Sequence, residues 1–123
     1  MQNTRKTGLR RIVYAFGHSM RGFASAWRCE AAFRQEVAMS VLLIPAAFWL
    51  ATDHIELILL MGSVLGVLLA ELANSSVEAV VDRIGSEIHI LAQRAKDIGS
   101  ALVFTSLIML VMVWGIVALN RFG

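Results

Sequence analysis

Hydrophobic residues along the chain form three long runs, separated by short polar segments. Residues 37–52 and 57–70 carry no charged side chain, and residues 101–119 form the longest uncharged run. A helix of about 20 mainly apolar residues, rising about 1.5 Å per residue, crosses the hydrocarbon core of a bilayer. With their flanking residues, the runs predict three transmembrane helices, at 31–52, 55–82 and 98–119.

The segment before the first run has hydrophobic residues at helical spacing and arginines on much of the opposite side. Its apolar positions are Leu9, Ile12, Val13, Phe16, Met20, Phe23, Ala24 and Trp27. A helix with one apolar and one basic face is typical of the membrane interface, where arginines meet anionic headgroups. A soluble amphipathic helix would have the same pattern, but the adjoining spans favour an interfacial helix at 9–28.

The composition also indicates an all-α membrane protein of one domain. Of the 123 residues, 58% are hydrophobic and 16% are charged, and the mean hydropathy is +0.70. A soluble domain has about a quarter charged residues. The net charge of +2, with no basic cluster among aromatic residues, argues against binding to nucleic acid. Cys29 is the only cysteine, which excludes an intrachain disulfide.

The positive charges predict how the chain is oriented in the membrane. Ten of the eleven Lys and Arg residues lie before the first uncharged run or between the second and third runs. Because positively charged loops stay in the cytoplasm, we expect the N-terminus and a loop at 83–97 there. The turn at 52–56 and the C-terminus should face the other side. The first 36 residues are too charged to resemble a signal peptide.

Polar side chains continue the second run as a single stripe. Glu71, Asn74, Ser75, Glu78 and Asp82 are spaced so that they share one face of a helix. A carboxylate at membrane depth is costly unless it faces a bundle interior, water or a cation. Glu71 is the deepest of these residues and therefore the strongest functional candidate. The alternative is a neutral carboxyl group that fixes helix packing.

Other charged residues at the same boundary suggest phosphate chemistry. Glu30 and Arg34 lie near the start of the first span, and Lys96 and Asp97 precede the third. Carboxylates are Mg²⁺ ligands, and a basic side chain can offset the charge of a transferring phosphoryl group. Taken singly, such residues are equally compatible with a solvated boundary. The chain has no Walker A pattern, which excludes a P-loop site, and its three histidines are too scattered for a zinc site.

Three motifs resemble the prokaryotic membrane diacylglycerol kinase family. They are EAAFRQE at 30–36, ELANSSVEAVVDRIGSE at 71–87 and RAKDIGSA at 94–101. The motifs occur in the family's order, and the resemblance covers nearly the whole chain. It implies a homotrimeric kinase of the bacterial inner membrane that uses ATP and Mg²⁺ to phosphorylate diacylglycerol to phosphatidic acid.

The resemblance also implies roles for individual residues. Glu71 matches the catalytic base that takes the proton from the lipid hydroxyl, and Glu30 and Glu78 match carboxylates linked to Mg²⁺. Positions that match nucleotide-binding residues are Arg11, His18, Glu30, Asn74, Glu78, Glu87, His89, Lys96 and Asp97. Positions that match the lipid-binding part are Arg11, Ala31, Ala32, Phe33, Arg34, Gln35, Trp49, Glu71 and Ser100.

The sequence differs from the family pattern at two positions, and three other functions are also compatible with it. His18 stands where relatives often carry an aromatic hydroxyl, and Met20 replaces a bulky aromatic residue, which leaves nucleotide affinity and lipid preference open. An undecaprenol kinase of the same family is one alternative. A small cation-coupled transporter could use Glu71 as its intramembrane carboxylate, although the third span offers no charge to continue such a path. A structural oligomer would leave Glu71 without a purpose.

Overall fold

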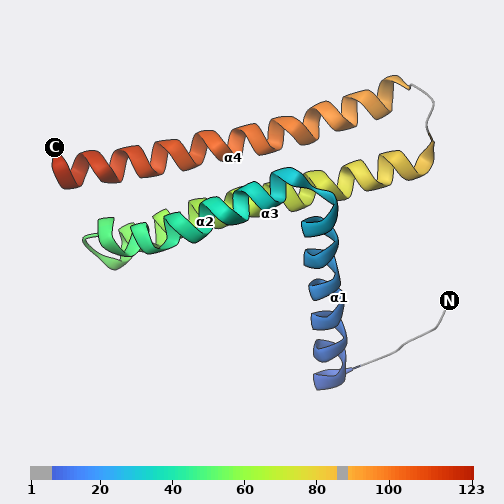
Figure 1. The fold of residues 1–123 in the computed structure, drawn as a ribbon, viewed down its shortest axis with the longest axis horizontal. Helices are drawn as coiled ribbons and strands as arrows, with labels where there is room; N and C mark the ends of the chain where they lie inside the picture. The colour runs from blue at the N-terminus through green and yellow to red at the C-terminus, as the bar shows by residue number, and fades with distance from the viewer. Residues whose placement is uncertain (1–6, 86–88) are drawn as a thin grey trace.

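The computed structural model of the chain describes residues 7–85 and 89–123, and the regular elements among them are helices. The four helices are α1 (Gly8–Cys29), α2 (Ala31–Leu50), α3 (His54–Ile84) and α4 (Ile90–Phe122). In Figure 1, α2, α3 and α4 run alongside one another, and α1 runs across their direction. The last three are long and apolar enough to cross a membrane. The predicted all-α membrane fold is therefore confirmed.

Helix α4 extends well beyond the apolar run that predicted it. Helix α4 begins at Ile90, so much of the segment 83–97, which we expected to be a loop, is helical. The Nδ1 atom of His89 accepts a hydrogen bond from the backbone N–H of Leu91 at 3.0 Å, which caps the start of α4. Hydropathy marks the part of a helix that suits lipid, whereas capping decides where the helix begins. This difference explains the longer helix.

The turn between α2 and α3 is closed by reciprocal hydrogen bonds. The Asp53 side chain accepts from the backbone N–H of Glu56 at 2.8 Å. Glu56 Oε1 in turn accepts from the backbone N–H and the hydroxyl of Thr52, at 2.9 and 2.8 Å. This exchange resembles a capping box and satisfies amide groups that a helix start leaves free.

The core lies along α3, which packs against both α2 and α4. Its buried hydrophobic residues form two clusters: Ala47, Leu50, Leu60 and Val117 in one, and Val64, Val67 and Leu110 in the other. Trp114 contacts both clusters. Its indole N–H donates to Ser63 Oγ at 3.1 Å and to the Leu60 carbonyl at 3.3 Å, so α4 is tied to α3 by a directional contact.

Two arginines cap the C-terminal ends of successive helices. Arg34 of α2 donates to the carbonyls of Trp27 and Arg28 in α1, at 2.6 and 3.4 Å. Arg121 of α4 donates to the carbonyls of Trp49 and Leu50 in α2, at 3.0 and 3.3 Å. The last carbonyls of a helix lack intrahelical partners and carry partial negative charge, which a guanidinium group satisfies. Each arginine therefore fixes the end of one helix against another.

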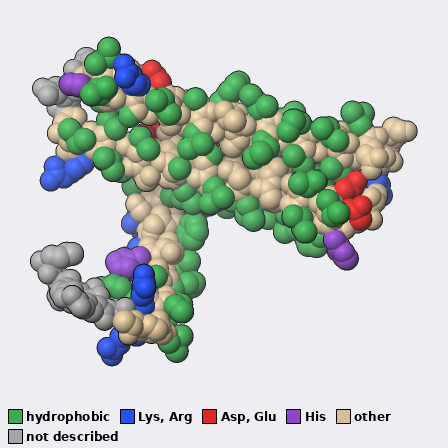
Figure 2. All heavy atoms as spheres, turned by 180° about the vertical axis from the view of Figure 1, so that it is seen from behind, with side chains coloured by type: hydrophobic (Ala, Val, Ile, Leu, Met, Phe, Trp, Pro, Cys, Tyr) green, Lys and Arg blue, Asp and Glu red, His purple; other side chains and the backbone are tan. Residues whose placement is uncertain are grey.

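The surface agrees with a membrane location. Figure 2 shows hydrophobic side chains along the length of the bundle and charged side chains gathered towards its ends. The predicted apolar face of α1 is also exposed, including Leu9 at 75%, Phe16 at 63% and Trp27 at 48%. Apolar faces of this extent are typical of contact with lipid or with other subunits.

Replacing Arg121 with alanine should destabilise the bundle. The change removes the cap on α2 and the contact of the guanidinium carbon with the Trp49 ring, 5.3 Å from its centroid. A cation at a helix C-terminus and an exposed cation–π contact each contribute about 0.5–1 kcal/mol, so we expect the free energy of unfolding to fall by about 1–2 kcal/mol. Denaturant unfolding of purified protein in detergent micelles measures this loss. Arg10→Ala, on the exposed side of α1, is the control, and an equal loss there would contradict the capping role.

Candidate active site

Glu71 is buried inside the apolar bundle. It lies near the middle of α3 and is only 4% exposed. Asn74, one turn further on, is 9% exposed. Glu78 is half-buried and Asp82 is exposed. The polar stripe therefore runs from the protein interior to the surface, in the order that its spacing predicts.

Three further carboxylates lie within electrostatic range of Glu71. Glu30 comes from the junction of α1 and α2, Glu78 from α3 itself, and Glu36 from α2. Together with Glu71 they form what we call the carboxylate cluster. Within residues 7–85 and 89–123, no Lys, Arg or His forms an ion pair with any of its members. Among the described side chains, no cation therefore offsets the repulsion between these carboxylates, although Nδ2 of Asn74 donates a hydrogen bond to Glu78 at 3.5 Å.

Three buried oxygen atoms near the cluster have no hydrogen-bond partner among the described residues. They are Glu36 Oε1, Asn74 Oδ1 and Ser75 Oγ. A buried polar atom without a partner costs about 1–3 kcal/mol. Glu36 belongs to the carboxylate cluster, and Asn74 and Ser75 lie one turn along α3 from Glu71. They suit a site that receives a cation or hydrogen-bond donors from a ligand.

The donor set suits a divalent cation only in combination with a ligand. The described residues contain no group of three or more His, Cys, Asp or Glu side chains placed to hold a metal ion. Mg²⁺ takes oxygen ligands and usually binds through one or two carboxylates, with water and substrate phosphates completing its shell. The oxygen-only cluster fits such an ion held jointly with phosphates. It does not form a closed metal cage of protein ligands.

Residues near the start of α4 lie beside the exposed end of the stripe. Lys96 Nζ forms an ion pair with Asp82 Oδ1 of α3 at 3.0 Å. Asp97 accepts a hydrogen bond from Gln93 at 3.0 Å, and Ser100 is exposed. The ion pair brings Lys96 to the same face of α3 as the cluster. His89 caps α4, and Glu87 lies outside the described residues.

Other predicted residues are near the cluster in sequence but serve the fold as well. Ala31, Ala32 and Gln35 lie in the first turns of α2, directly after Glu30. Phe33 is buried there at 5% exposure. Arg34, which we expected to bind lipid, has its guanidinium group bonded to the last carbonyls of α1.

Three predicted residues lie away from the cluster in the structure. Arg11 lies about 27 Å along α1 from the junction with α2, since 18 residues separate it from Cys29. His18 accepts a hydrogen bond from Arg21 at 2.9 Å and packs edge-on against Tyr14, with ring centroids 4.9 Å apart. Trp49 lies at the far end of α2, where it contacts Arg121. The crosswise direction of α1 and the length of α2 cause these separations.

Glu36 was not assigned a role from the sequence. In the structure of α2, Phe33 and Ser40 are buried and seven residues apart. Glu36 lies between them at a spacing of three and four residues, which places it on the same inward face. Which face of the first span is buried is seen only in the structure, so the sequence pattern alone did not single out this carboxylate.

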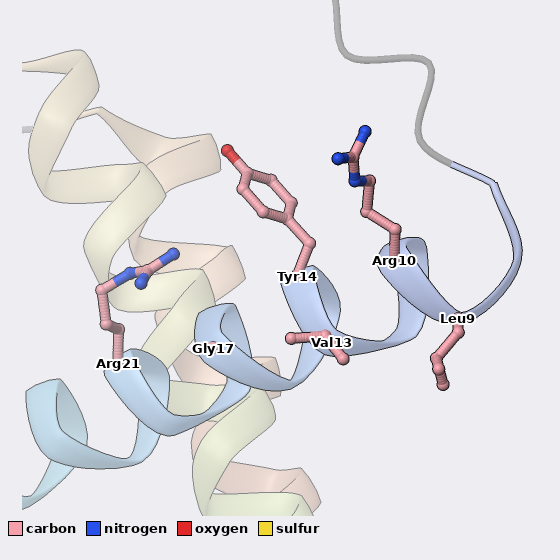
Figure 3. A pocket seen from close by; sticks show the side chains of 6 residues that line it. All are labelled: Leu9, Arg10, Val13, Tyr14, Gly17 and Arg21. Atoms are coloured by element: carbon pink, nitrogen blue, oxygen red, sulfur yellow. The ribbon is translucent and has the colours of Figure 1, made fainter.

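Two cavities adjoin α1. One of about 490 Å³ lies between α1 and α3 and includes Glu30 and Ser75 in its lining, so it reaches the cluster. The other, about 550 Å³, is formed along α1 and is shown in Figure 3. Its lining residues are Leu9, Arg10, Val13, Tyr14, Gly17 and Arg21. It contains neither Arg11 nor His18, and the cavity at Glu30 is the better candidate for a substrate.

The fold and the cluster together define a small helical membrane protein with a polar site built into its apolar bundle. A family model described as prokaryotic diacylglycerol kinase matches residues 17–118, and the chain belongs to this family. It is 49% identical to the diacylglycerol kinase of Escherichia coli K12, over 95% of this chain and 96% of that protein. The Haemophilus influenzae diacylglycerol kinase is also 49% identical, over 89% and 92% of the two chains. The Pseudomonas aeruginosa diacylglycerol kinase is 46% identical, over 94% of each.

The ion pair between Lys96 and Asp82 should contribute little to stability. Its side chains are 41% and 67% exposed, and exposed ion pairs typically contribute about 0–1 kcal/mol. We therefore expect Lys96→Met and Asp82→Asn each to lower the free energy of unfolding by less than about 1 kcal/mol. A double-mutant cycle of denaturant unfolding in micelles gives the coupling energy. A coupling of several kcal/mol would show that this pair, rather than the core, sets the packing of α3 against α4.

Proposed function

We propose that the protein is an ATP-dependent diacylglycerol kinase of the bacterial inner membrane. It transfers the γ-phosphoryl group of ATP to the hydroxyl of diacylglycerol, which gives phosphatidic acid and ADP. Membership of the family and the names of three relatives at 46–49% identity support this activity. The observation that carries the proposal at the site is the buried Glu71, surrounded by carboxylates without a cationic partner among the described residues.

Glu71 is the proposed general base. An alcohol becomes a better nucleophile when a group within hydrogen-bond reach accepts its proton as the new bond to phosphorus forms. Diacylglycerol has its hydroxyl near the headgroup level, so its base has to lie inside the bundle rather than on the wet surface. Glu71 is 4% exposed and therefore lies inside the bundle. The cavity at Glu30 is also lined by Leu72 and Ser75, so it lies beside the part of α3 that carries Glu71.

The remaining roles concern the nucleotide. Glu30 and Glu78 are the proposed ligands of Mg²⁺, which when bound neutralises charge on the phosphates of ATP. Lys96, exposed at the end of the stripe, is placed to offset further phosphate charge, and Asp97 lies next to it. Phosphoryl transfer depends mainly on positioning and charge stabilisation. A base, two carboxylates and a cation that follow one another along the stripe, from the protein interior to the surface, suit this reaction.

The proposal includes a homotrimer whose N-terminus and α3–α4 connection lie in the cytoplasm. The distribution of Lys and Arg supports this orientation. The exposed apolar surface of α2, α3 and α4 leaves room for contacts between subunits. In the same arrangement, α1 lies in the interface with its apolar face in the lipid.

Glu71→Gln should abolish turnover without unfolding the protein. The substitution keeps the side-chain shape but removes the proton acceptor, and loss of a general base lowers the rate about 10²- to 10⁴-fold. Phosphoryl transfer from MgATP is measured in mixed micelles that contain either diacylglycerol or undecaprenol. Glu56→Gln, which alters a carboxylate at the other end of α3, is the matched control and should retain activity. Near-normal rates for Glu71→Gln would show that Glu71 is not the general base. If the wild type transferred phosphate to neither lipid, the proposed kinase activity would be wrong. Transfer to undecaprenol alone would show that undecaprenol, and not diacylglycerol, is the acceptor.

Glu30→Gln and Glu78→Gln should raise the Mg²⁺ concentration needed for half-maximal rate. Each variant removes one charged oxygen ligand but keeps a neutral one, which weakens the ion's binding without emptying the site. The rate is measured as a function of Mg²⁺ at saturating ATP. An unchanged Mg²⁺ dependence in both variants would show that these carboxylates are not ligands.

A further inference from the structure

Gly99 of α4 packs directly against Asn74 of α3, in the part of the bundle that holds Glu71 and Glu78. Gly99 is buried. A Cβ atom placed on it would collide with Oδ1 of Asn74 and would lie 3.3 Å from Cγ and 3.9 Å from Cα of that residue. Glycine is therefore the only residue that leaves room for the Asn74 side chain in this position.

In this contact the Asn74 carboxamide has Oδ1 against Gly99 and Nδ2 towards Glu78. Its Oδ1 is buried against Gly99 and has no hydrogen-bond partner within the described residues. The Gly99 Cα hydrogen lies in the direction of the missing Cβ, so Oδ1 meets a C–H group, which is a weak donor. On the other side, Nδ2 donates to Glu78 Oε2 at 3.5 Å, at the limit of a hydrogen bond. A small displacement of the carboxamide would break this bond.

We propose that Gly99 is a positioning residue for phosphoryl transfer. Its missing Cβ seats the Asn74 carboxamide, and the seated carboxamide directs Nδ2 towards Glu78, the proposed ligand of Mg²⁺. The proposal rests on the proposed function for the role of Glu78. Residues that orient a metal ligand through one hydrogen bond typically affect metal affinity or activity about 10- to 100-fold when they are lost.

Two other glycines provide matched controls in the same pair of helices. A Cβ on Gly66 of α3 would make an ordinary contact of 3.6 Å with the flexible end of Met109. A Cβ on Gly115 of α4 would meet nothing within 4 Å. Glycine to alanine at these positions makes the same chemical change without displacing a polar side chain, so it reports the general cost of the substitution.

The kinetic test compares Gly99→Ala with the two controls. We expect Gly99→Ala to lower kcat at least about tenfold and to raise the Mg²⁺ concentration for half-maximal rate, with little change in KM for diacylglycerol. Gly66→Ala and Gly115→Ala should stay close to the wild type in all three values. If Gly99 served packing alone, the variant would lose rate in proportion to its folded fraction and keep the Mg²⁺ dependence of the wild type. That result would overturn the proposal.

A second test asks whether Gly99 acts through Asn74. Asn74→Ala removes the side chain with which the new methyl group would collide, so Gly99→Ala should cause no further loss of rate in that background. The denaturation midpoints of the same four proteins provide a readout that needs no kinase activity. Gly99→Ala should lower the midpoint in the wild-type background but not in the Asn74→Ala background. If the single variant Gly99→Ala does not fold, adding Asn74→Ala should restore its folding. Equal losses in both backgrounds would overturn the proposal. Coupled midpoints in a protein that phosphorylates neither lipid would instead refute the proposed function and leave the contact intact.

Discussion

The burial of Glu71 constrains much of the structure around it. Placing an acidic side chain at the centre of a membrane helix costs about 2.5–3.5 kcal/mol of insertion free energy. A carboxylate that is only 4% exposed therefore needs polar groups beside it. The chain surrounds it with Glu30, Glu36 and Glu78 rather than with a basic residue. Placing carboxylates beside Glu71 adds electrostatic repulsion between them. It also leaves buried oxygen atoms without hydrogen-bond partners among the described residues. The site is therefore less stable on its own than an apolar bundle would be, and a cation brought in with the substrate would relieve that repulsion.

A site of this kind needs the two longest helices to be held in one register. The hydrophobic core along α3 cannot do this alone, because apolar contact is largely non-directional. Two contacts between specific residues of α3 and α4 fix the register. Trp114 donates to Ser63 and to the Leu60 carbonyl towards one end, and Gly99 meets Asn74 towards the other. With both in place, the polar face of α3 lies opposite the polar residues of α4, as the ion pair between Asp82 and Lys96 also shows.

Local pattern predicted the helices and the gradient of the stripe, because bilayer thickness fixes the length of a span and helical periodicity fixes its faces. It could not predict contacts that depend on how the helices meet. Arg34 and Arg121 cap helices other than their own, and Arg121 lies 71 and 72 residues from its acceptors. Glu36 required knowledge of which face of α2 is buried. The start of α4 was placed too late, because it is set by the His89 cap rather than by hydropathy.

The direction of α1 bears on how the proposed nucleotide contacts can form. Arg34 holds the last carbonyls of α1, and the apolar face of that helix suits the plane of the interface. Both features keep α1 directed away from its own bundle, with Arg11 about 27 Å from the junction. Folding α1 back would break the Arg34 cap and remove the exposed Leu9 and Phe16 from their proposed place at the membrane interface. A neighbouring subunit can approach the extended helix without either cost. The proposed roles of Arg11 and His18 are therefore best met across a subunit boundary, which ties the proposed trimer to the reaction itself.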